Sequence, residues 1–217
     1  MARPRLHDAA LRDRLLDVAS RTISEHGEPA VTVRSVAVDA GTSASAVYSL
    51  FGSRDELVVA VSAEGFRRFA GHLDAVPRTD DPAGDLAALG EAYRRFALAD
   101  PHFYTVMFGR GVRPATDAPD AVARPTFRVL RDAVARLLPD GDDPRAQDVA
   151  LGLWGLVHGL VSLEIAGLLA GDESERAARY AAATVVVGRA LVAGSAPGAA
   201  EEPGPDASGP SSGGRRA

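Results

Sequence analysis

The chain has 217 residues, a net charge of −5 and no cysteine. This length allows one larger domain or two small ones with a sizeable hydrophobic core, and the lack of cysteine excludes disulfide bonds and thiolate metal sites. All 24 basic residues are arginine, and residues 1–73 contain nine arginines and nine acidic residues. A broadly basic nucleic-acid surface is therefore excluded, so any affinity for DNA must come from individually placed side chains. The candidates are Arg3, Arg5, Arg34 and Arg54.

An amphipathic helix is expected near the N-terminus. Leu11, Leu15, Val18 and Ile23 recur at helical spacing along this stretch. Such spacing places apolar side chains on one face, which can pack against a core. Gly27 is the expected stop, because glycine readily adopts the left-handed conformation that closes many helices. The first residues form no apolar signal stretch, which predicts that the protein is cytoplasmic.

Two short helices are expected next, over residues 33–39 and 44–50. Thr32 and Ser43 are the expected N-caps, since each hydroxyl can accept a bond from a free N–H of the following first turn. Gly41 gives the backbone the freedom for a sharp turn between the two helices. The pattern predicts a helix-turn-helix over about residues 32–51.

The second short helix has the composition of a helix that enters a DNA major groove. Its polar side chains would point outward: Ser43, Ser45, Tyr48 and Ser49. Its apolar side chains, with those of the preceding helix, would face the core: Val36, Ala37, Val47 and Leu50. Two helices joined at a glycine also form ordinary helical corners, so the DNA-binding interpretation depends on the flanking residues.

With the flanking residues included, the sequence resembles the tetracycline-repressor (TetR) family of transcriptional regulators over residues 9–73. The matching residues are Gly27, Thr32, Val36, Ala37, Ala40, Gly41, Ser43, Tyr48, Phe51, Arg54 and Leu57. The chain departs from the family at Thr42, where an aliphatic residue is usual, and at Ala44, where Lys or Arg is common. Arg54 stands where the family usually has Lys, which exchanges a point charge for a fork-shaped donor.

The resemblance implies an all-α, TetR-like fold of about nine helices. Residues 1–53 would form an N-terminal arm and a three-helix DNA-binding domain, and residues 54–193 a ligand-binding and dimerisation domain. The implied partners are double-stranded operator DNA of palindromic sequence, a second copy of the chain in a homodimer, and an unidentified small-molecule ligand. The implied function is repression of transcription, relieved by a small apolar or amphipathic ligand.

The second short helix and its surroundings supply the predicted DNA contacts. A phenol can bond a phosphate oxygen from the groove wall, which favours this role for Tyr48. Arg54 lies at a helix N-terminus, where its charge and the free N–H groups both favour an anion. The predicted DNA-binding residues are Thr32, Arg34, Thr42, Ser43, Ser45, Tyr48, Ser49 and Arg54.

The rest of the chain predicts further helices and no strands. Proline and glycine residues mark most of their ends. The expected helices cover residues 54–73, 85–99, 103–108, 120–138, 144–170 and 174–193, with a loop over 109–117. Residues 194–217 contain no aromatic or branched aliphatic residue. They cannot bury enough apolar surface to offset the cost of ordering, so this tail is expected to be disordered.

Residues 149–170 are apolar enough for two interpretations. A membrane span would need this length, and Gly155 and Gly159 have the spacing of a membrane helix contact. Against a span, Glu164 would cost about 2.5–3.5 kcal/mol near a bilayer centre, and the flanks are acidic. The preferred interpretation is a helix outside the membrane that packs on its own domain and on a partner. With the last helix it would form a four-helix dimer interface.

A second resemblance covers about residues 85–193. Residues 154–159, WGLVHG, and residues 101–109 are similar to the WHG-type C-terminal domain of one TetR subgroup. Trp154 and His158 lie one helical turn apart and would give an apolar cavity one orienting hydrogen bond. The bland alternative is that these side chains simply fill the core. The predicted ligand-binding residues are Phe66, Tyr93, Phe103, Met107, Phe127, Trp154 and His158.

No enzyme chemistry is expected from the motifs. The five histidines form no pair at helical spacing with another histidine or a carboxylate, so no metal site and no cofactor are predicted. Phosphate-binding, dinucleotide-binding and serine-hydrolase motifs are also absent from the sequence. One alternative stays open at this point, namely a helical enzyme or interaction module that does not bind DNA.

Overall fold

The computed structural model describes residues 4–108, 124–138 and 144–194, and within these ranges the chain forms nine α-helices, one 3-10 turn and no strand. The all-α expectation is therefore confirmed. The predicted disordered tail and the loop over 109–117 lie outside the described residues.

The N-terminal head contains helices α1 to α3. Their bounds are α1 Pro4–His26, the 3-10 turn Glu28–Ala30, α2 Val33–Asp39 and α3 Ala44–Phe51. Gly27 and Gly41 have φ angles of 82° and 67°, so both expected turning points use the left-handed backbone that glycine tolerates best. The core of the head includes the side chains Leu15, Leu16, Val36 and Val47, each fully buried.

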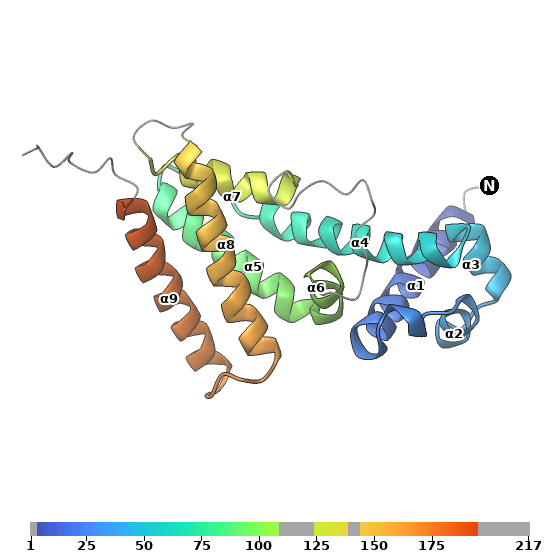
Figure 1. The fold of residues 1–217 in the computed structure, drawn as a ribbon. Coiled ribbons are helices and arrows are strands. Elements are labelled where there is room, and N and C mark those ends of the chain that lie inside the picture. The colour runs from blue at the N-terminus through green and yellow to red at the C-terminus, as the bar shows by residue number, and fades with distance from the viewer. Residues whose placement is uncertain (1–3, 109–123, 139–143, 195–217) are drawn as a thin grey trace, which may run out of the picture.

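Helix α4, Arg54–Asp74, connects the head to the rest of the molecule. Figure 1 shows it as a long rod that leaves the head and runs alongside the C-terminal helices. Leu57 and Val61 belong to the core of the head, whereas Phe69 and Leu73 belong to the core of the C-terminal part. A displacement of this helix therefore acts on both cores.

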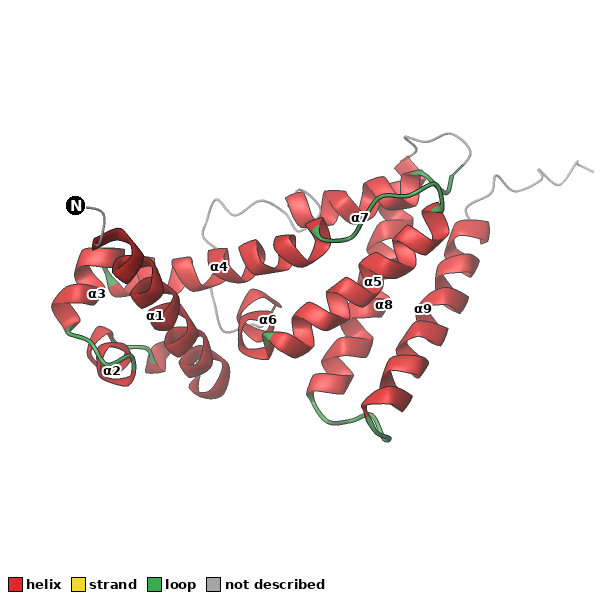
Figure 2. Cartoon of the chain, turned by 180° about the vertical axis from the view of Figure 1, so that it is seen from behind, coloured by secondary structure: helices red, strands yellow, loops and turns green. Residues whose placement is uncertain are grey.

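Five helices form the C-terminal part. They are α5 Pro82–Ala99, α6 Pro101–Phe108, α7 Pro125–Ala135, α8 Pro144–Ile165 and α9 Glu173–Gly194. Helices α8 and α9 pack against each other, and α9 lies at the end of the molecule remote from the head in both views (Figures 1 and 2). Helix α6 lies between the head and this bundle and packs on α1, α4 and α5.

Several predicted helix ends are wrong: α5 begins at Pro82 rather than at residue 85, and α7 ends at Ala135 rather than at residue 138. Two further ends differ for a clear local backbone reason. Arg124 is extended (φ −69°, ψ 143°), and α7 begins at Pro125 rather than at residue 120, because a residue before proline disfavours the helical conformation. Helix α8 ends at Ile165 rather than at 170. Gly167 has a φ of 70°, and the N–H of Leu168 donates to the carbonyl of Leu163 at 3.0 Å, which is a Schellman-type stop.

Among the described helices, α8 is long and apolar enough to cross a membrane by length and composition, and about a third of its most apolar window, 33%, is buried. Its buried side chains pack against α5, α7 and α9. The remaining apolar side chains of α8 form a surface that is considered with the site below.

Candidate functional site

Side-chain caps fix the starts of the short helices in the head. The Thr32 hydroxyl accepts from the Ser35 N–H at 3.0 Å, and the Thr32 N–H donates to the Ser35 hydroxyl at 3.3 Å. Ser43 accepts from the Ala46 N–H at 3.2 Å in the same way. A cap of this kind stabilises a helix by about 1 kcal/mol. Both predicted caps are confirmed, and they set the orientation of α3.

Helix α3 presents its polar face to solvent. Ser45 and Ser49 are exposed, and the Tyr48 side chain is 54% exposed with no hydrogen-bond partner among the described residues. Val47 and Phe51 point the other way and are buried. Four further predicted DNA-binding residues, apart from Arg54, lie outside this helix. Thr32, Arg34 and Ser43 are exposed, and Thr42 is half-buried.

Arg54 is not the free cation that the sequence suggested. Its guanidinium donates to a carboxylate oxygen of Glu28 at 2.8 Å, to the Val31 carbonyl at 3.2 Å and to the Glu28 carbonyl at 2.5 Å. A further bond reaches the exposed carboxylate of Asp55 at 2.9 Å. The side chain is only 31% exposed. It ties the start of α4 to the segment between α1 and α2, which is a structural role.

Replacing Arg54 with alanine is therefore expected to destabilise the head. The change leaves the Glu28 carboxylate and two carbonyls without their partner, which costs about 2–3 kcal/mol, or roughly 5–10 °C of melting temperature. Thermal denaturation followed by circular dichroism would measure the loss. Arg34→Ala, an exposed arginine of the same domain, should leave the melting temperature unchanged. An unchanged melting temperature in Arg54→Ala, together with a lower salt dependence of DNA binding, would restore the phosphate role.

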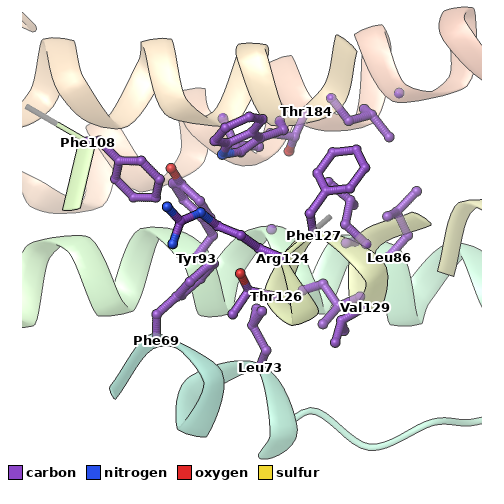
Figure 3. A pocket seen from close by; sticks show the side chains of 18 of the residues that line it. Phe69, Leu73, Leu86, Tyr93, Phe108, Arg124, Thr126, Phe127, Val129 and Thr184 are labelled. Atoms are coloured by element: carbon purple, nitrogen blue, oxygen red, sulfur yellow. The ribbon is translucent and has the colours of Figure 1, made fainter. Parts of the chain in front are cut away.

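A cavity of about 1200 Å³ lies in the C-terminal part, enclosed by α4 to α9. Most of its lining is apolar or aromatic, as is usual for small-molecule sites. Five of the seven predicted ligand-binding residues line it: Phe66, Tyr93, Met107, Phe127 and Trp154. Figure 3 shows the lining side chains from close by.

Phe103 and His158 are the two predicted residues that do not line the cavity. Phe103 is 2% exposed and packs in the core of the head, with the Arg68 guanidinium 4.2 Å from its ring centre. Phe103 and Met107 lie one turn apart on the same face of α6, and both side chains approach Gly65 of α4, but of the two only Met107 lines the cavity. Sequence spacing identified this face of the helix but not which of its side chains reach the cavity.

His158 lies behind the cavity wall. Its Nδ1 is 2.8 Å from the Tyr104 hydroxyl and 3.1 Å from the Tyr93 hydroxyl, and Ser162 extends the network. Burial lowers the pKa of His158, so the ring is neutral at pH 7. Tyr93 lines the cavity in its place. The Nδ1 atom of His158, one of its two ring nitrogens, is therefore bonded to protein hydroxyls.

Arg124 is a lining residue that the sequence did not indicate. Its guanidinium carbon lies 4.1 Å from the ring centre of Phe66, and Figure 3 shows the side chain extended towards Tyr93 and Phe108. The sequence analysis did not identify Arg124 as a candidate ligand-binding residue, because residues 120–138 were expected to form one continuous helix. Recognising that Pro125 starts the helix would have placed Arg124 at the N-cap position, directly before the first turn.

One ionic cluster joins the head to the C-terminal part. Arg68 of α4 pairs with Asp17 of α1 at 2.8 Å, with Glu64 at 2.8 Å and with Asp100 at 3.0 Å. Glu64 is 4% exposed, and the bonds from Arg67 and Arg68 lower its pKa despite its burial. Asp17 and Asp100 fix the position of α4 relative to α1 and to the start of α6, and Glu64, which lies on α4 itself, holds the Arg68 side chain.

Helices α8 and α9 carry an exposed apolar surface on the side away from the cavity. Its large exposed residues are Leu151 and Leu163 on α8 and Val186 on α9, the last 67% exposed. Gly155 lies one turn from Leu151, and a Cβ added at Gly155 or Gly159 would meet no atom within 4 Å. Large apolar surfaces of this kind mark interfaces in proteins that are otherwise well packed.

These features define a helix-turn-helix DNA-binding protein with a separate cavity domain. Residues 15–61 match the family described as bacterial regulatory proteins, tetR family, and residues 86–194 match the tetracyclin repressor-like C-terminal domain. The chain belongs to the TetR family of DNA-binding transcriptional regulators.

Known proteins agree with this assignment. The HTH-type transcriptional regulator Rv1816 of Mycobacterium tuberculosis is 25% identical over 192 residues, covering 73% of this chain and 82% of the relative. The crystal structure of protein SCO4313 is similar with a TM-score of 0.64 and 29% identity, covering 87% of this chain and 98% of that one. A TetR variant from Acinetobacter baumannii AYE in complex with minocycline has a TM-score of 0.51 and 21% identity, covering 83% and 93%.

Proposed function

We propose that this regulator is a homodimeric repressor that leaves its operator when a small apolar or amphipathic ligand enters the cavity. One observation carries the proposal: Val106 of α6 is 3% exposed in the core of the head and also lines the cavity. A ligand that shifts α6 must therefore repack the head. The minocycline complex of a structural relative supports the ligand role.

Contacts to the operator would come from α3, the turn before it and the start of α2. Ser45 and Ser49 would approach base edges, and Tyr48 and Arg34 would contact phosphates. Thr32 and Ser43 remain at the surface beside them, although their hydroxyls also cap helices. Arg54 would act indirectly, because it holds the segment between α1 and α2 against the start of α4. These are few DNA contacts for one subunit, in keeping with the neutral net charge of the head. Sufficient affinity would therefore require the two heads of a dimer.

Dimerisation would use the exposed apolar surface of α8 and α9. Pairing the two helices with their symmetry mates gives a four-helix arrangement, in which Gly155 and Gly159 let the backbones approach closely. The two recognition helices of a dimer must lie about 34–36 Å apart to read successive turns of a palindromic operator.

Release would follow from a change in that spacing. A ligand acts through its differential affinity for the two arrangements of the dimer, and the arrangement with displaced α6 and α4 would no longer match DNA. Helices α4 and α6 are in close contact at Gly65, where an added Cβ would lie 2.7 Å from Met107. Movement of Met107 by a ligand would therefore be transmitted directly to α4.

The repressor would act in the cytoplasm, where its operator is accessible. The domain division that we propose places residues 1–53 in the DNA-binding domain and residues 54–193 in the cavity and dimerisation domain.

Selection of genomic fragments on the immobilised full-length protein tests the proposal. We expect a small set of fragments with palindromic sites, which the protein then shifts in a gel. Ser45→Ala/Ser49→Ala, confined to the exposed face of α3, should abolish the selection without loss of folding. If the wild-type protein retains no more DNA than this variant does, DNA binding through this surface of α3 is contradicted.

A further inference from the structure

The Arg124 guanidinium is a positive charge placed inside a largely aromatic part of the cavity. It lies 4.1 Å from the Phe66 ring centre, and Phe108 packs edge-on against Phe66 with 6.0 Å between their ring centres. Tyr93 and Phe69 form the neighbouring wall, with 5.3 Å between their ring centres. Stacking on an aromatic ring holds an arginine in place but leaves its charge uncompensated.

No carboxylate among the described residues neutralises this charge. Arg124 takes part in no ion pair with them, whereas Arg68, Arg94 and Arg136 each pair with an acid. Asp81 is the acidic residue that lines the cavity, but it caps the far end of α5. Twelve helical positions separate it from Tyr93, which is about 18 Å along a helix. A cation that has no acidic partner within the described ranges and lies next to an apolar wall favours an anion that arrives with the ligand.

We propose that the ligand of this cavity is an organic anion with an elongated apolar body, whose acidic group pairs with Arg124. This inference rests on the proposed function of the cavity as the ligand site. The acidic group would lie between Phe66, Tyr93 and Phe108, where the five N–H donors of a guanidinium can hold a carboxylate through two parallel bonds. A neutral ligand would leave the charge unpaired, and a cationic ligand would be repelled.

The rest of the cavity fits the apolar body. From Tyr93 the lining continues along α5 to Ala83, a length of about 15 Å at the rise of a helix. The walls of this section come from α5, α7 and α9 and are mostly aliphatic: Leu86, Leu89, Val129, Leu130, Val185 and Val192. An extended chain fits such a space better than a compact ring system.

The single tryptophan of the chain makes the test direct. Trp154 lines the cavity, so its fluorescence reports on occupancy of this site alone. The purified full-length protein is titrated with dodecanoate, dodecanol and dodecyltrimethylammonium, which share one alkyl chain and differ in the charge of the head group. A rigid aromatic carboxylate, 2-naphthoate, separates the elongated body from the anionic group. We expect dodecanoate to bind at least about tenfold more tightly than dodecanol, the ammonium or 2-naphthoate.

Arg124→Met removes the charge and keeps an unbranched side chain against Phe66. It should weaken dodecanoate binding about tenfold or more and leave dodecanol binding unchanged. Arg128→Met is the matched control, because Arg128 lies one turn along α7, is exposed and does not line the cavity. Equal binding of dodecanoate and dodecanol by the wild type overturns the inference, as does binding of no carboxylate or an equal loss in both variants. Tighter binding of 2-naphthoate would overturn the elongated body.

Measuring fragment release with the same four compounds separates this inference from the proposed function. If the alcohol or the ammonium releases DNA and dodecanoate does not, the anionic ligand is wrong and regulation by a cavity ligand stands. If the protein binds no DNA fragment, with or without these compounds, the proposed function fails, whatever the fluorescence titration shows.

Discussion

Gly155→Leu is expected to convert the regulator into a monomer with little affinity for DNA. A Cβ added at this position meets nothing within 4 Å in the isolated chain, and leucine is a better helix former than glycine, so the fold should be retained. In the proposed dimer the same side chain would fill the space used by the partner helix. Overpacking of this kind costs about 1–3 kcal/mol at each of the two symmetry-related positions, so the dimer dissociation constant should rise about 30-fold to 10,000-fold or more.

Sedimentation velocity at micromolar concentration measures the change, and a mobility shift on a selected fragment measures its effect on DNA. Gly71→Leu is the control, because it is also a helical glycine with open space around it and lies on α4. Gly188→Leu is a less specific test, since an added Cβ there would lie 3.5 Å from Leu153 of the same chain. A Gly155→Leu protein that still sediments as a dimer would place the interface elsewhere.

Tyr48→Ala is expected to reduce DNA affinity about 100-fold in the dimer. A hydrogen bond from a phenol to a charged phosphate contributes about 1.5 kcal/mol, and the dimer loses two of them, or about 3 kcal/mol. The side chain is 54% exposed and supports no core, so the melting temperature should stay the same. Specific and nonspecific sites should weaken alike, because phosphate contacts carry no sequence information.

Tyr48→Phe separates the hydroxyl from the ring. If the phosphate bond carries the effect, the phenylalanine variant should lose nearly as much affinity as the alanine variant in fluorescence anisotropy with a selected fragment. Leu168→Ala, which changes a 70% exposed residue between α8 and α9, serves as the remote control. Full affinity in Tyr48→Phe would assign the contact to the ring, and full affinity in both variants would remove α3 from the proposed interface.

The head shows how far local sequence rules reach. Thr32 and Ser43 are caps and Gly27 and Gly41 are turning points in the structure, as their positions predicted, because each role depends on bonds within three or four residues. The exposed face of α3 followed from the same short-range periodicity. The intramolecular bonds of Arg54 did not follow from local rules, because its partners, Glu28 and Val31, lie 26 and 23 residues earlier in the chain.

By itself, the sequence determined the helix class, most helix ends, the caps, the outward polar face and the family, all of which depend on residue type and short spacing. Only the tertiary structure decided which side chains share a space. The Tyr93 hydroxyl and the His158 ring meet across 65 positions, and Arg124 reaches Phe66 from a helix start that proline sets. The sequence pattern of a buried helix does not distinguish its side chains from one another. The packing of neighbouring helices decides whether each side chain lies in the core, joins a hydrogen-bond network or lines the cavity.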